Sequence, residues 1–273
     1  MHVHFLDPYR PLVSPIHALD GRVKFVLTVA FILTVSLTPY GAWPVYLLLL
    51  SLMISVEILS GLGVGFVLRR ANLALPFVLA ALPLVFTTPG RELARLPIGP
   101  WTLVATVEGM LHFINVALKS WLSVQAAIVL ASSTPFPDLL LAMRAVRIPR
   151  LLVAMFGLMW RYLFVLADEG LRLMRARASR SGHARRVDGE ARRARAGGSL
   201  GWRARVTGGM AGSLFLRAIE RSDRIYVAML SRGYDGEVRS FALPPLSLRA
   251  QSTLWIGLSV LGILWLTGLL AWG

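Results

Sequence analysis

The sequence predicts an all-α integral membrane protein with about five transmembrane helices. A cytoplasmic coupling module of two long helices and one short amphipathic helix is expected beside them. Three observations lead to this prediction. The chain is 56% hydrophobic and only 16% charged. Its apolar runs approach the length of about 20 residues that a bilayer-spanning helix needs. Residues 134–250 hold 21 of the 29 basic residues and nine of the 14 acidic ones, and such a basic block beside membrane spans marks the cytoplasmic side.

Four regions follow from this distribution. Residues 1–22 mix charges with prolines and are expected to form an interfacial N-terminal arm. Residues 23–133 form a four-span membrane region, residues 134–250 form the coupling module, and residues 251–273 hold the last transmembrane helix. The individual spans are expected at 23–38, 42–59, 71–88, 105–131 and 252–271. Pro76 and Pro83 predict kinks in the third span, and residues 89–101 are expected to be a loop between the third and fourth.

The positive-inside rule sets the orientation. With residues 134–250 in the cytoplasm, the N-terminus also falls in the cytoplasm and the loop 89–101 lies outside. This arrangement holds if the apolar segment 151–167 does not cross the bilayer. If that segment crosses, there are six spans and the N-terminus is external, which the basic residues near it disfavour. Five spans are therefore preferred.

The coupling module begins with Thr-Pro-Phe-Pro-Asp at 134–138, which is a helix start. Arg144, Arg147 and Arg150 make the helix that follows amphipathic and suited to the membrane interface. One long helix is expected from about residue 151 to 180 and a second from about 210 to 232. The Gly- and Arg-rich segment 183–208 is expected to be a mobile loop that contacts the lipid bilayer.

An internal repeat organises the module. A shift of 52 residues places DEGLRLMRARASRS, which starts at Asp168, onto ERSDRIYVAMLSRG, which starts at Glu220. In each copy an acid and an arginine four residues later can pair across one helical turn: Asp168 with Arg172, and Glu220 with Arg224. Both copies end in Ser-Arg followed by a small residue. These triplets are Ser179, Arg180 and Ser181 in the first copy, and Ser231, Arg232 and Gly233 in the second.

Two interpretations of Arg180 and Arg232 stand side by side. A cation in the last turn complements the negative end of the helix dipole. Alternatively, the rigid guanidinium fork, exposed at a helix end, suits a carboxylate-lined cleft of a partner. The local pattern does not decide between them.

Two charges fall inside apolar segments. Lys119 lies near the middle of the fourth span and must face protein or a water-filled cavity. Pairing with a carboxylate such as Glu108 or Glu57 is favoured over a place in a transport path. Arg161 is the one charge in the apolar first part of the first long helix, and it is expected to support the coupling helices.

The sequence contains no catalytic constellation. It has no Walker-type phosphate loop, no His-Glu-x-x-His pair and no Gly-x-Ser-x-Gly elbow, and it has no cysteine. We therefore expect a protein that is not an enzyme, with no cofactor and no metal ligands. His2 and His4, without a third ligand nearby in the sequence, are weak evidence for a metal site, and whether they contact metal stays open. Nucleic acid is not an expected partner, because the basic loop holds no aromatic residue beyond Trp202.

Four segments carry a family resemblance: SPIHALDGRVKF, STPFPDLLLAMRAVRIPR, WRYLFVLADEGLRLMRARASRS and ERSDRIYVAMLSRGYDG. Together they resemble the transmembrane T component of energy-coupling-factor (ECF) importers, the CbiQ/EcfT family. The paired Ser-Arg-small triplets are the specific part, although Ser181 stands where the family often has glycine.

The resemblance implies a multi-pass scaffold in the bacterial cytoplasmic (inner) membrane. Its implied partners are two ATP-binding-cassette (ABC-type) ATPase subunits, contacted by Arg180 and Arg232, and a substrate-binding membrane subunit. It leans towards the cobalt or nickel branch, with a shared T component for vitamin uptake as the alternative. From another class, a basic membrane adaptor without a transport role is the rival.

Overall fold

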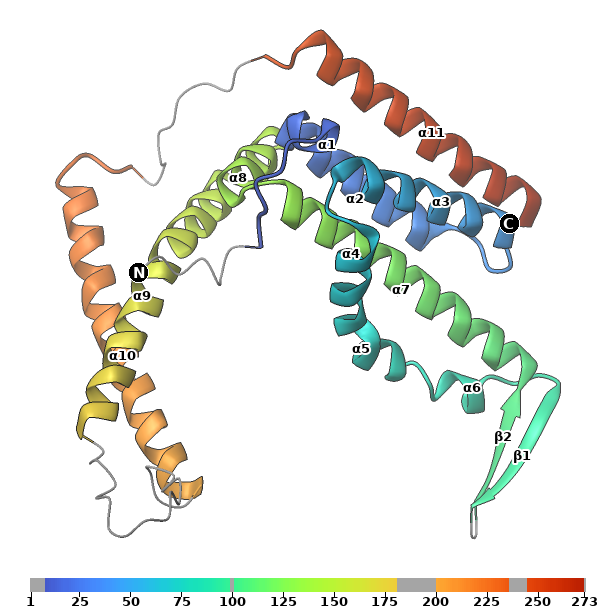
Figure 1. Ribbon diagram of the computed structural model, residues 1–273, viewed down its shortest axis with the longest axis horizontal. Coiled ribbons are helices and arrows are strands. Elements are labelled where there is room, and N and C mark those ends of the chain that lie inside the picture. Colours follow the sequence, from blue (N-terminus) through green and yellow to red (C-terminus); the bar gives the residue numbers. More distant parts are fainter. Residues whose placement is uncertain (1–7, 99–100, 181–199, 236–244, 273) are drawn as a thin grey trace, which may run out of the picture. The chain divides into compact units, whose positions relative to one another are not determined.

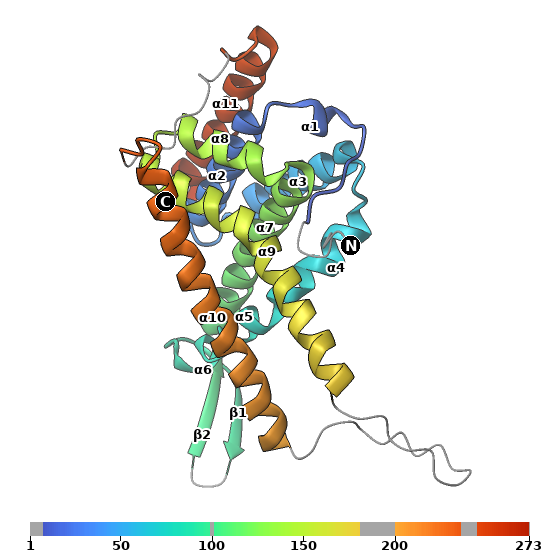
Figure 2. The ribbon, with the colours of Figure 1, turned by 90° about the vertical axis from the view of Figure 1, so that its left-hand side faces the viewer.

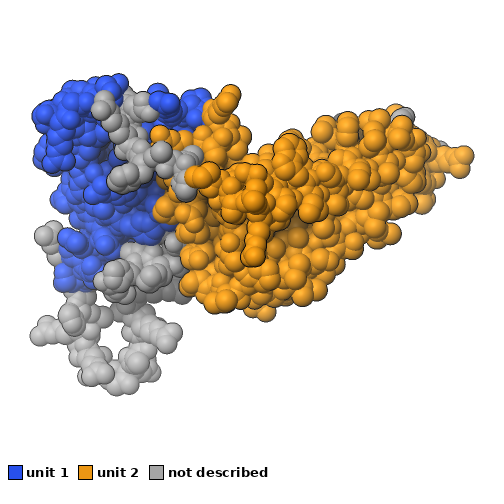
Figure 3. Space-filling model, turned by 90° about the horizontal axis from the view of Figure 1, so that it is seen from above, with its two compact units in different colours: residues 1–7, 148–241 blue, residues 8–147, 242–273 orange. Residues whose placement is uncertain are grey.

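The computed structural model describes residues 8–98, 101–180, 200–235 and 245–272 (Figure 1). These residues are almost entirely helical, as expected for an all-α protein, apart from one two-stranded hairpin. The chain divides into two compact units, which are coloured separately in Figure 3. The larger unit comprises residues 8–147 and 242–273, and the smaller one comprises residues 148–241.

Helices α2 (Gly21–Leu37), α3 (Trp43–Ser60), α7 (Val107–Ser133) and α11 (Leu248–Trp272) form the frame of the larger unit. Asp20 caps α2 by accepting a hydrogen bond from the Arg22 backbone N–H. Its carboxylate also binds the Arg22 guanidinium at 2.8 Å, and this hydrogen bonding holds the pKa of Asp20 below its usual range. Helix α3 ends at Gly61, whose φ of 69° is a left-handed conformation that suits glycine.

The core lies where α2, α3 and α7 meet, with α11 packed on α2 and α3. Its fully enclosed members include Val35, Leu49 and Leu122, none of which is exposed. Glycine allows α11 a close approach to α2: a Cβ at Gly257 would lie 2.6 Å from Leu27 Cδ2. The short helices α1 (Pro15–Ala18) and α8 (Phe136–Ala145) pack on α3 and α2 respectively.

The third expected span is not a single helix. Residues 64–87 form α4 (Val64–Ala71), the 3-10 turn η2 (Asn72–Ala74), α5 (Leu75–Leu79) and α6 (Leu84–Thr87). Each is far shorter than the roughly 20 residues of a spanning helix. Pro76 lies in the first turn of α5 and Pro83 precedes α6, so the prolines expected to kink this span instead separate short helices.

The expected loop at 89–101 contains most of an antiparallel hairpin. Strand β1 (Glu92–Ile98) pairs with β2 (Trp101–Thr106) in a register that joins Ile98 to Trp101. Thr106 ends the hairpin and caps α7, since its hydroxyl accepts from the Gly109 N–H at 3.1 Å. The fourth helix therefore begins at Val107 rather than at residue 105.

Among the residues that the structure describes, four helices are long and apolar enough to cross a membrane: α3, α7, α9 and α11. Helix α2 has 17 residues, or about 25 Å of helix. It is slightly shorter than the roughly 20 residues that a bilayer-spanning helix needs. The smaller unit consists of α9 (Arg150–Arg180) and α10 (Leu200–Leu230). Helix α10 starts ten residues before the expected position at 210, so residues 200–208 are helical rather than part of the predicted loop. The rest of that loop lies outside the described residues.

By contact, α8 belongs to the larger unit, whereas the sequence groups it with the coupling module. The functional boundary at residue 134 stays a prediction.

Candidate functional site

Helices α9 and α10 pack against each other in antiparallel fashion (Figure 2). Near the end of α9, Arg177 donates to Thr207 Oγ1 at 3.3 Å, and its guanidinium carbon lies 5.5 Å from the Trp202 ring centre. Towards the middle of α9, a Cβ at Gly170 would lie 3.6 Å from Leu214. The end of α9 therefore meets the start of α10, and the two C-termini point in opposite directions.

Glu169 joins the two helices at this crossing. Its Oε1 lies 3.3 Å from Arg217 Nη1, and its Oε2 lies 3.0 Å from Arg221 Nη2. The Glu169 side chain is only 17% exposed. Each carboxylate oxygen thus accepts a charge-assisted bond, a stronger type than a bond between neutral groups.

The sequence does not point to Glu169, because Asp168 is the acid aligned by the repeat. Within the described residues, no ion pair of 4.0 Å or less joins Asp168 to Arg172 or Glu220 to Arg224. Asp168 and Arg172 instead line a hollow of about 460 Å³ together with the Glu169 cluster. A signal for Glu169 does exist in its spacing, since it stands four residues after Val165 and four before Leu173, and both of these line the same hollow.

The repeated helix ends share one local geometry. Ser179 donates its hydroxyl to the Ala176 carbonyl at 2.9 Å, and Ser231 donates to the Ala228 carbonyl at 3.0 Å. Both serines are exposed. The shift of 52 residues seen in the sequence therefore relates two equivalent positions in space, each three residues beyond an alanine.

Arg232 occupies the C-cap of α10. Gly233 follows with φ 79°, and two backbone bonds close the helix: Gly233 N–H to the Leu230 carbonyl and Tyr234 N–H to the Met229 carbonyl, both 3.0 Å. This is the Schellman pattern, which needs a left-handed residue after the cap. Gly233 thus ends the helix, and Arg232 is exposed at the tip.

Arg180 is the last residue of α9. Its side chain and Ser181 lie outside what the structure describes. Of the other predicted residues, Glu220 and Arg224 are exposed on α10. Arg161 is exposed on α9, with its guanidinium carbon 6.0 Å from the ring centre of Tyr162.

Within the described parts of the chain, Lys119 has no carboxylate partner, which corrects the interpretation favoured from sequence. Its Nζ donates to the backbone carbonyls of Ser36 and Thr38, each at 2.9 Å. These carbonyls lie at the C-terminal end of α2, where an ammonium group complements the helix dipole. Glu108 accepts instead from the Arg91 N–H. Glu57 is fully buried, and neither of its carboxylate oxygens has a hydrogen-bond partner among the described residues.

No group of three or more potential metal ligands occurs in the part of the chain that the structure describes. His2 and His4 lie outside that part.

Comparison with known protein families shows to which family the chain belongs. The family model for CbiQ, described as a cobalt transport protein, matches residues 13–241. The chain belongs to the CbiQ family of cobalt transport proteins. The match includes both Ser-Arg-small triplets and all of α9 and α10, and it confirms the resemblance drawn from the sequence segments.

Individual proteins that are similar to this chain carry names that agree with this family assignment. The cobalt transport protein CbiQ of Rhodobacter capsulatus is 29% identical over 208 residues, which cover 76% of this chain and 77% of the relative. CbiQ of Salmonella typhimurium is 26% identical over 78% of this chain and 90% of its own length. The energy-coupling factor transporter transmembrane protein EcfT of Thermosediminibacter oceani is 28% identical over 85% of this chain and 84% of its own. This CbiQ-family chain is therefore a membrane transport protein.

Proposed function

We propose that this CbiQ-family protein is the non-catalytic coupling subunit of an ATP-driven ECF importer. In this role Arg180 and Arg232 dock onto two ABC-type ATPase subunits, and the chain transmits their motion to a substrate-binding membrane subunit. The observation that carries the proposal is the antiparallel pairing of α9 and α10, with a Ser-Arg terminus at each end.

The spacing of the two arginines fits two separate partners. Glu169 lies opposite Arg217 and Arg221, so in this register Arg232 lies opposite the first turns of α9, some 26 residues before Arg180. At 1.5 Å per residue the two termini are about 40 Å apart. That separation is about the width of a small domain, which suits one ATPase per arginine.

The antiparallel pairing also bears on orientation. If α9 crossed the bilayer, its length of about 46 Å would separate Arg180 from Arg232 by the membrane. Both arginines reach cytosolic ATPases only when the helix pair lies along the membrane surface. The proposal therefore keeps residues 134–250 and the N-terminus in the cytoplasm of a bacterial inner-membrane protein, with α9 uncrossed despite its apolar first half.

Coupling between the ATPases and the substrate-binding subunit needs a structural element with two arrangements. Both binding sites must shift the balance between these arrangements. We assign this role to the crossing of α9 and α10. Closure of the ATPase dimer on ATP moves the two docked ends relative to each other, and the Glu169 pairs keep the helices in contact at the crossing. The exposed apolar residues of both helices, such as Met155, Met159, Phe215 and Leu216, then offer a moving surface to the bilayer and the substrate-binding subunit.

Cobalt or nickel ions are the proposed cargo, since two relatives are named as cobalt transport proteins. A shared T component for vitamin uptake is the second candidate, favoured by the EcfT relative. Selectivity would reside in the substrate-binding subunit.

Co-purification tests the proposal. The chain is expressed together with its neighbouring reading frames and purified from membranes. It is expected to co-purify with two ATPase subunits and one further membrane protein. If the chain is an importer subunit, the purified assembly is expected to hydrolyse ATP. A chain that purifies alone under the same mild detergent, while the neighbouring proteins are present in the membrane, would contradict the importer role and favour a basic adaptor.

A further inference from the structure

Two arginines lie over one phenylalanine ring in the larger unit. The guanidinium carbon of Arg10 is 3.7 Å from the centre of the Phe66 ring, and that of Arg70 is 4.5 Å from the same centre. Both distances are within the range in which the face of a ring attracts a guanidinium. Contact through the flat face leaves the five N–H groups, which lie in the guanidinium plane, for other acceptors. Arg10 and Arg70 are called the arginine pair below.

Two separate segments of the chain bring the arginine pair to this ring. The backbone N–H of Arg10 donates to the carbonyl of Ser132, near the end of α7, at 2.9 Å. The Arg10 carbonyl accepts from His17 Nε2 at 3.1 Å, so the backbone of this residue is held on both sides. Arg70 stands four residues after Phe66 on α4, and a side chain at that spacing reaches back over the preceding turn.

The arginine pair has no acidic partner in the part of the chain that the structure describes. Neither guanidinium makes an ion pair or a hydrogen bond there. Residues 8–19 and 58–90, from which the pair and its ring come, contain no aspartate or glutamate. Two like charges at one ring repel each other, and an anion bound to their free N–H groups would offset this repulsion.

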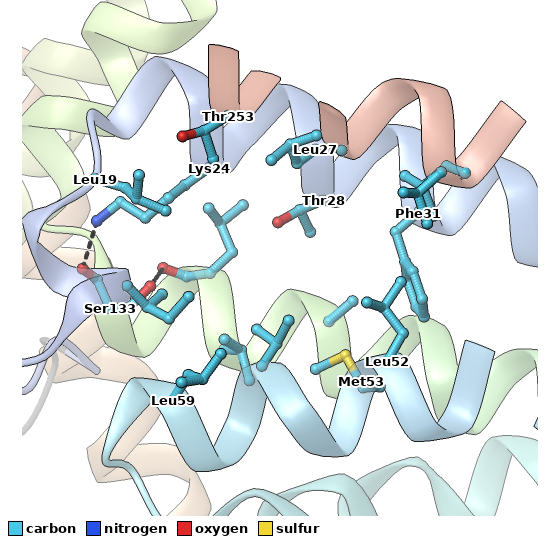
Figure 4. Close-up of a pocket in the computed structure, with 18 of the residues that line it drawn as sticks. Leu19, Lys24, Leu27, Thr28, Phe31, Leu52, Met53, Leu59, Ser133 and Thr253 are labelled. Carbon is cyan, nitrogen blue, oxygen red and sulfur yellow. Dashed lines mark hydrogen bonds between the residues drawn. The ribbon is translucent and has the colours of Figure 1, made fainter. Parts of the chain in front are cut away.

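Other cations at this end of the unit already have their partners. Arg22 binds the Asp20 carboxylate at 2.8 Å. Lys24 donates to the Ser133 carbonyl at 2.9 Å (Figure 4) and is attracted by the carboxylates of Asp20 and Asp138. The arginine pair therefore differs from these neighbours in lacking a counter-charge, and not merely in being basic.

The surroundings of the arginine pair are those of a membrane interface. Ile58 and Leu59, in the last turn of α3, are 63% and 53% exposed. In α4, Val67 and Ala71 are fully enclosed while Arg69 is exposed, so this helix is amphipathic and suited to lie in the interface. Exposed apolar side chains at the end of a span face the hydrocarbon, and arginines just beyond them lie at the level of the headgroups.

We infer that the arginine pair binds the phosphate group of a phospholipid from the adjacent leaflet, with a preference for acidic lipids. A guanidinium binds phosphate through two parallel N–H···O bonds, and unpaired cations beside a membrane span attract acidic headgroups. A lipid fits better than a free phosphate ion, because its acyl chains also cover Ile58 and Leu59. This inference requires only that α3 and α7 lie in a bilayer, and it does not depend on the coupling role.

The test is native mass spectrometry of the full chain, freed of lipid in detergent and titrated with phosphatidylglycerol or phosphatidylcholine. The first phosphatidylglycerol is expected to bind at least about fivefold more tightly than the first phosphatidylcholine, as one cation near the surface provides. Inorganic phosphate at the same concentrations is expected not to compete with the lipid. Equal affinities for the two phospholipids, or competition by inorganic phosphate, would overturn the inference.

Three variants separate the arginine pair from general basic charge. Arg70→Gln is expected to lower the affinity for phosphatidylglycerol about fivefold. Arg69→Gln removes the same charge from a side chain that does not lie over the ring, and it is expected to keep the wild-type affinity. Phe66→Leu removes no charge but removes the ring that orients the pair, and it is expected to lower the affinity as well.

Size-exclusion profile and helical circular dichroism confirm that the three variants are folded. The inference fails if the Arg69 and Arg70 variants bind phosphatidylglycerol equally well, or if Phe66→Leu binds it like the wild type. Either result would mean that surface charge alone attracts the lipid.

Discussion

Arg232→Glu is expected to abolish ATPase co-purification and substrate uptake. Arg232 is exposed at the C-cap of α10, and the backbone of that cap is closed by Gly233 rather than by the arginine side chain. The helix therefore persists in the variant, while a carboxylate faces the carboxylates of the proposed ATPase cleft. Loss of one partner of a buried interfacial charge pair weakens binding at least about thirtyfold, and charge reversal adds repulsion. The measurement is the amount of ATPase retained per chain after affinity purification.

Arg69→Glu is the matched control for this variant. Arg69 is an exposed arginine in the last turn of α4. With the N-terminus in the cytoplasm, the spans α2 and α3 return the chain to that side, where the proposal also places Arg232. It carries the same change of charge and is expected to leave assembly intact. Wild-type assembly and uptake by the Arg232 variant would end the proposal that this residue is a docking contact.

Glu169→Gln is expected to uncouple ATP hydrolysis from uptake without dissolving the complex. The docking arginines are unchanged, so the ATPases remain bound and active. The amide cannot replace a carboxylate between Arg217 and Arg221, so α9 and α10 move independently at their crossing. Uptake is expected to fall on the order of tenfold, within the usual range for a lost coupling between two sites. The measurement is uptake per ATP hydrolysed in proteoliposomes.

The adjacent carboxylate provides the control for Glu169. Asp168→Asn removes the same charge one residue earlier on α9, where no cross-helix ion pair is present among the described residues. It is expected to transport at nearly the wild-type rate. The exchanged pair Glu169→Arg with Arg221→Glu restores the attraction and is expected to recover part of the coupling. Equal uptake by the two single variants would refute the role assigned to the Glu169 pairs.

Sequence pattern predicts the elements whose causes are local. The apolar runs that became α2, α3, α7 and α11 were found within a few residues, because length and composition decide them. The small residue that closes the second triplet, Gly233, ends α10 because the position after the cap favours left-handed backbone. The two Ser-Arg termini could be aligned because both copies of the repeat retain the same spacing.

Features that depend on distant residues were not predicted. Lys119 binds carbonyls more than 80 residues away, and no local pattern distinguishes these acceptors from a carboxylate. Glu169 pairs across two helices whose antiparallel packing follows from tertiary contacts. The third expected span is broken into short helices rather than kinked, because its two prolines interrupt continuous helical hydrogen bonding.

The central claim is that both helix termini face the ATPases from one side of the membrane, at opposite ends of one antiparallel pair. The chain has no cysteine, so Ser179→Cys and Ser231→Cys each introduce a single thiol beside a docking arginine. In inside-out vesicles a membrane-impermeant maleimide is expected to label both positions, and bound ATPases are expected to protect both. If one of the two positions is labelled only from the outer face of the membrane, α9 crosses the bilayer, and that result would contradict the account.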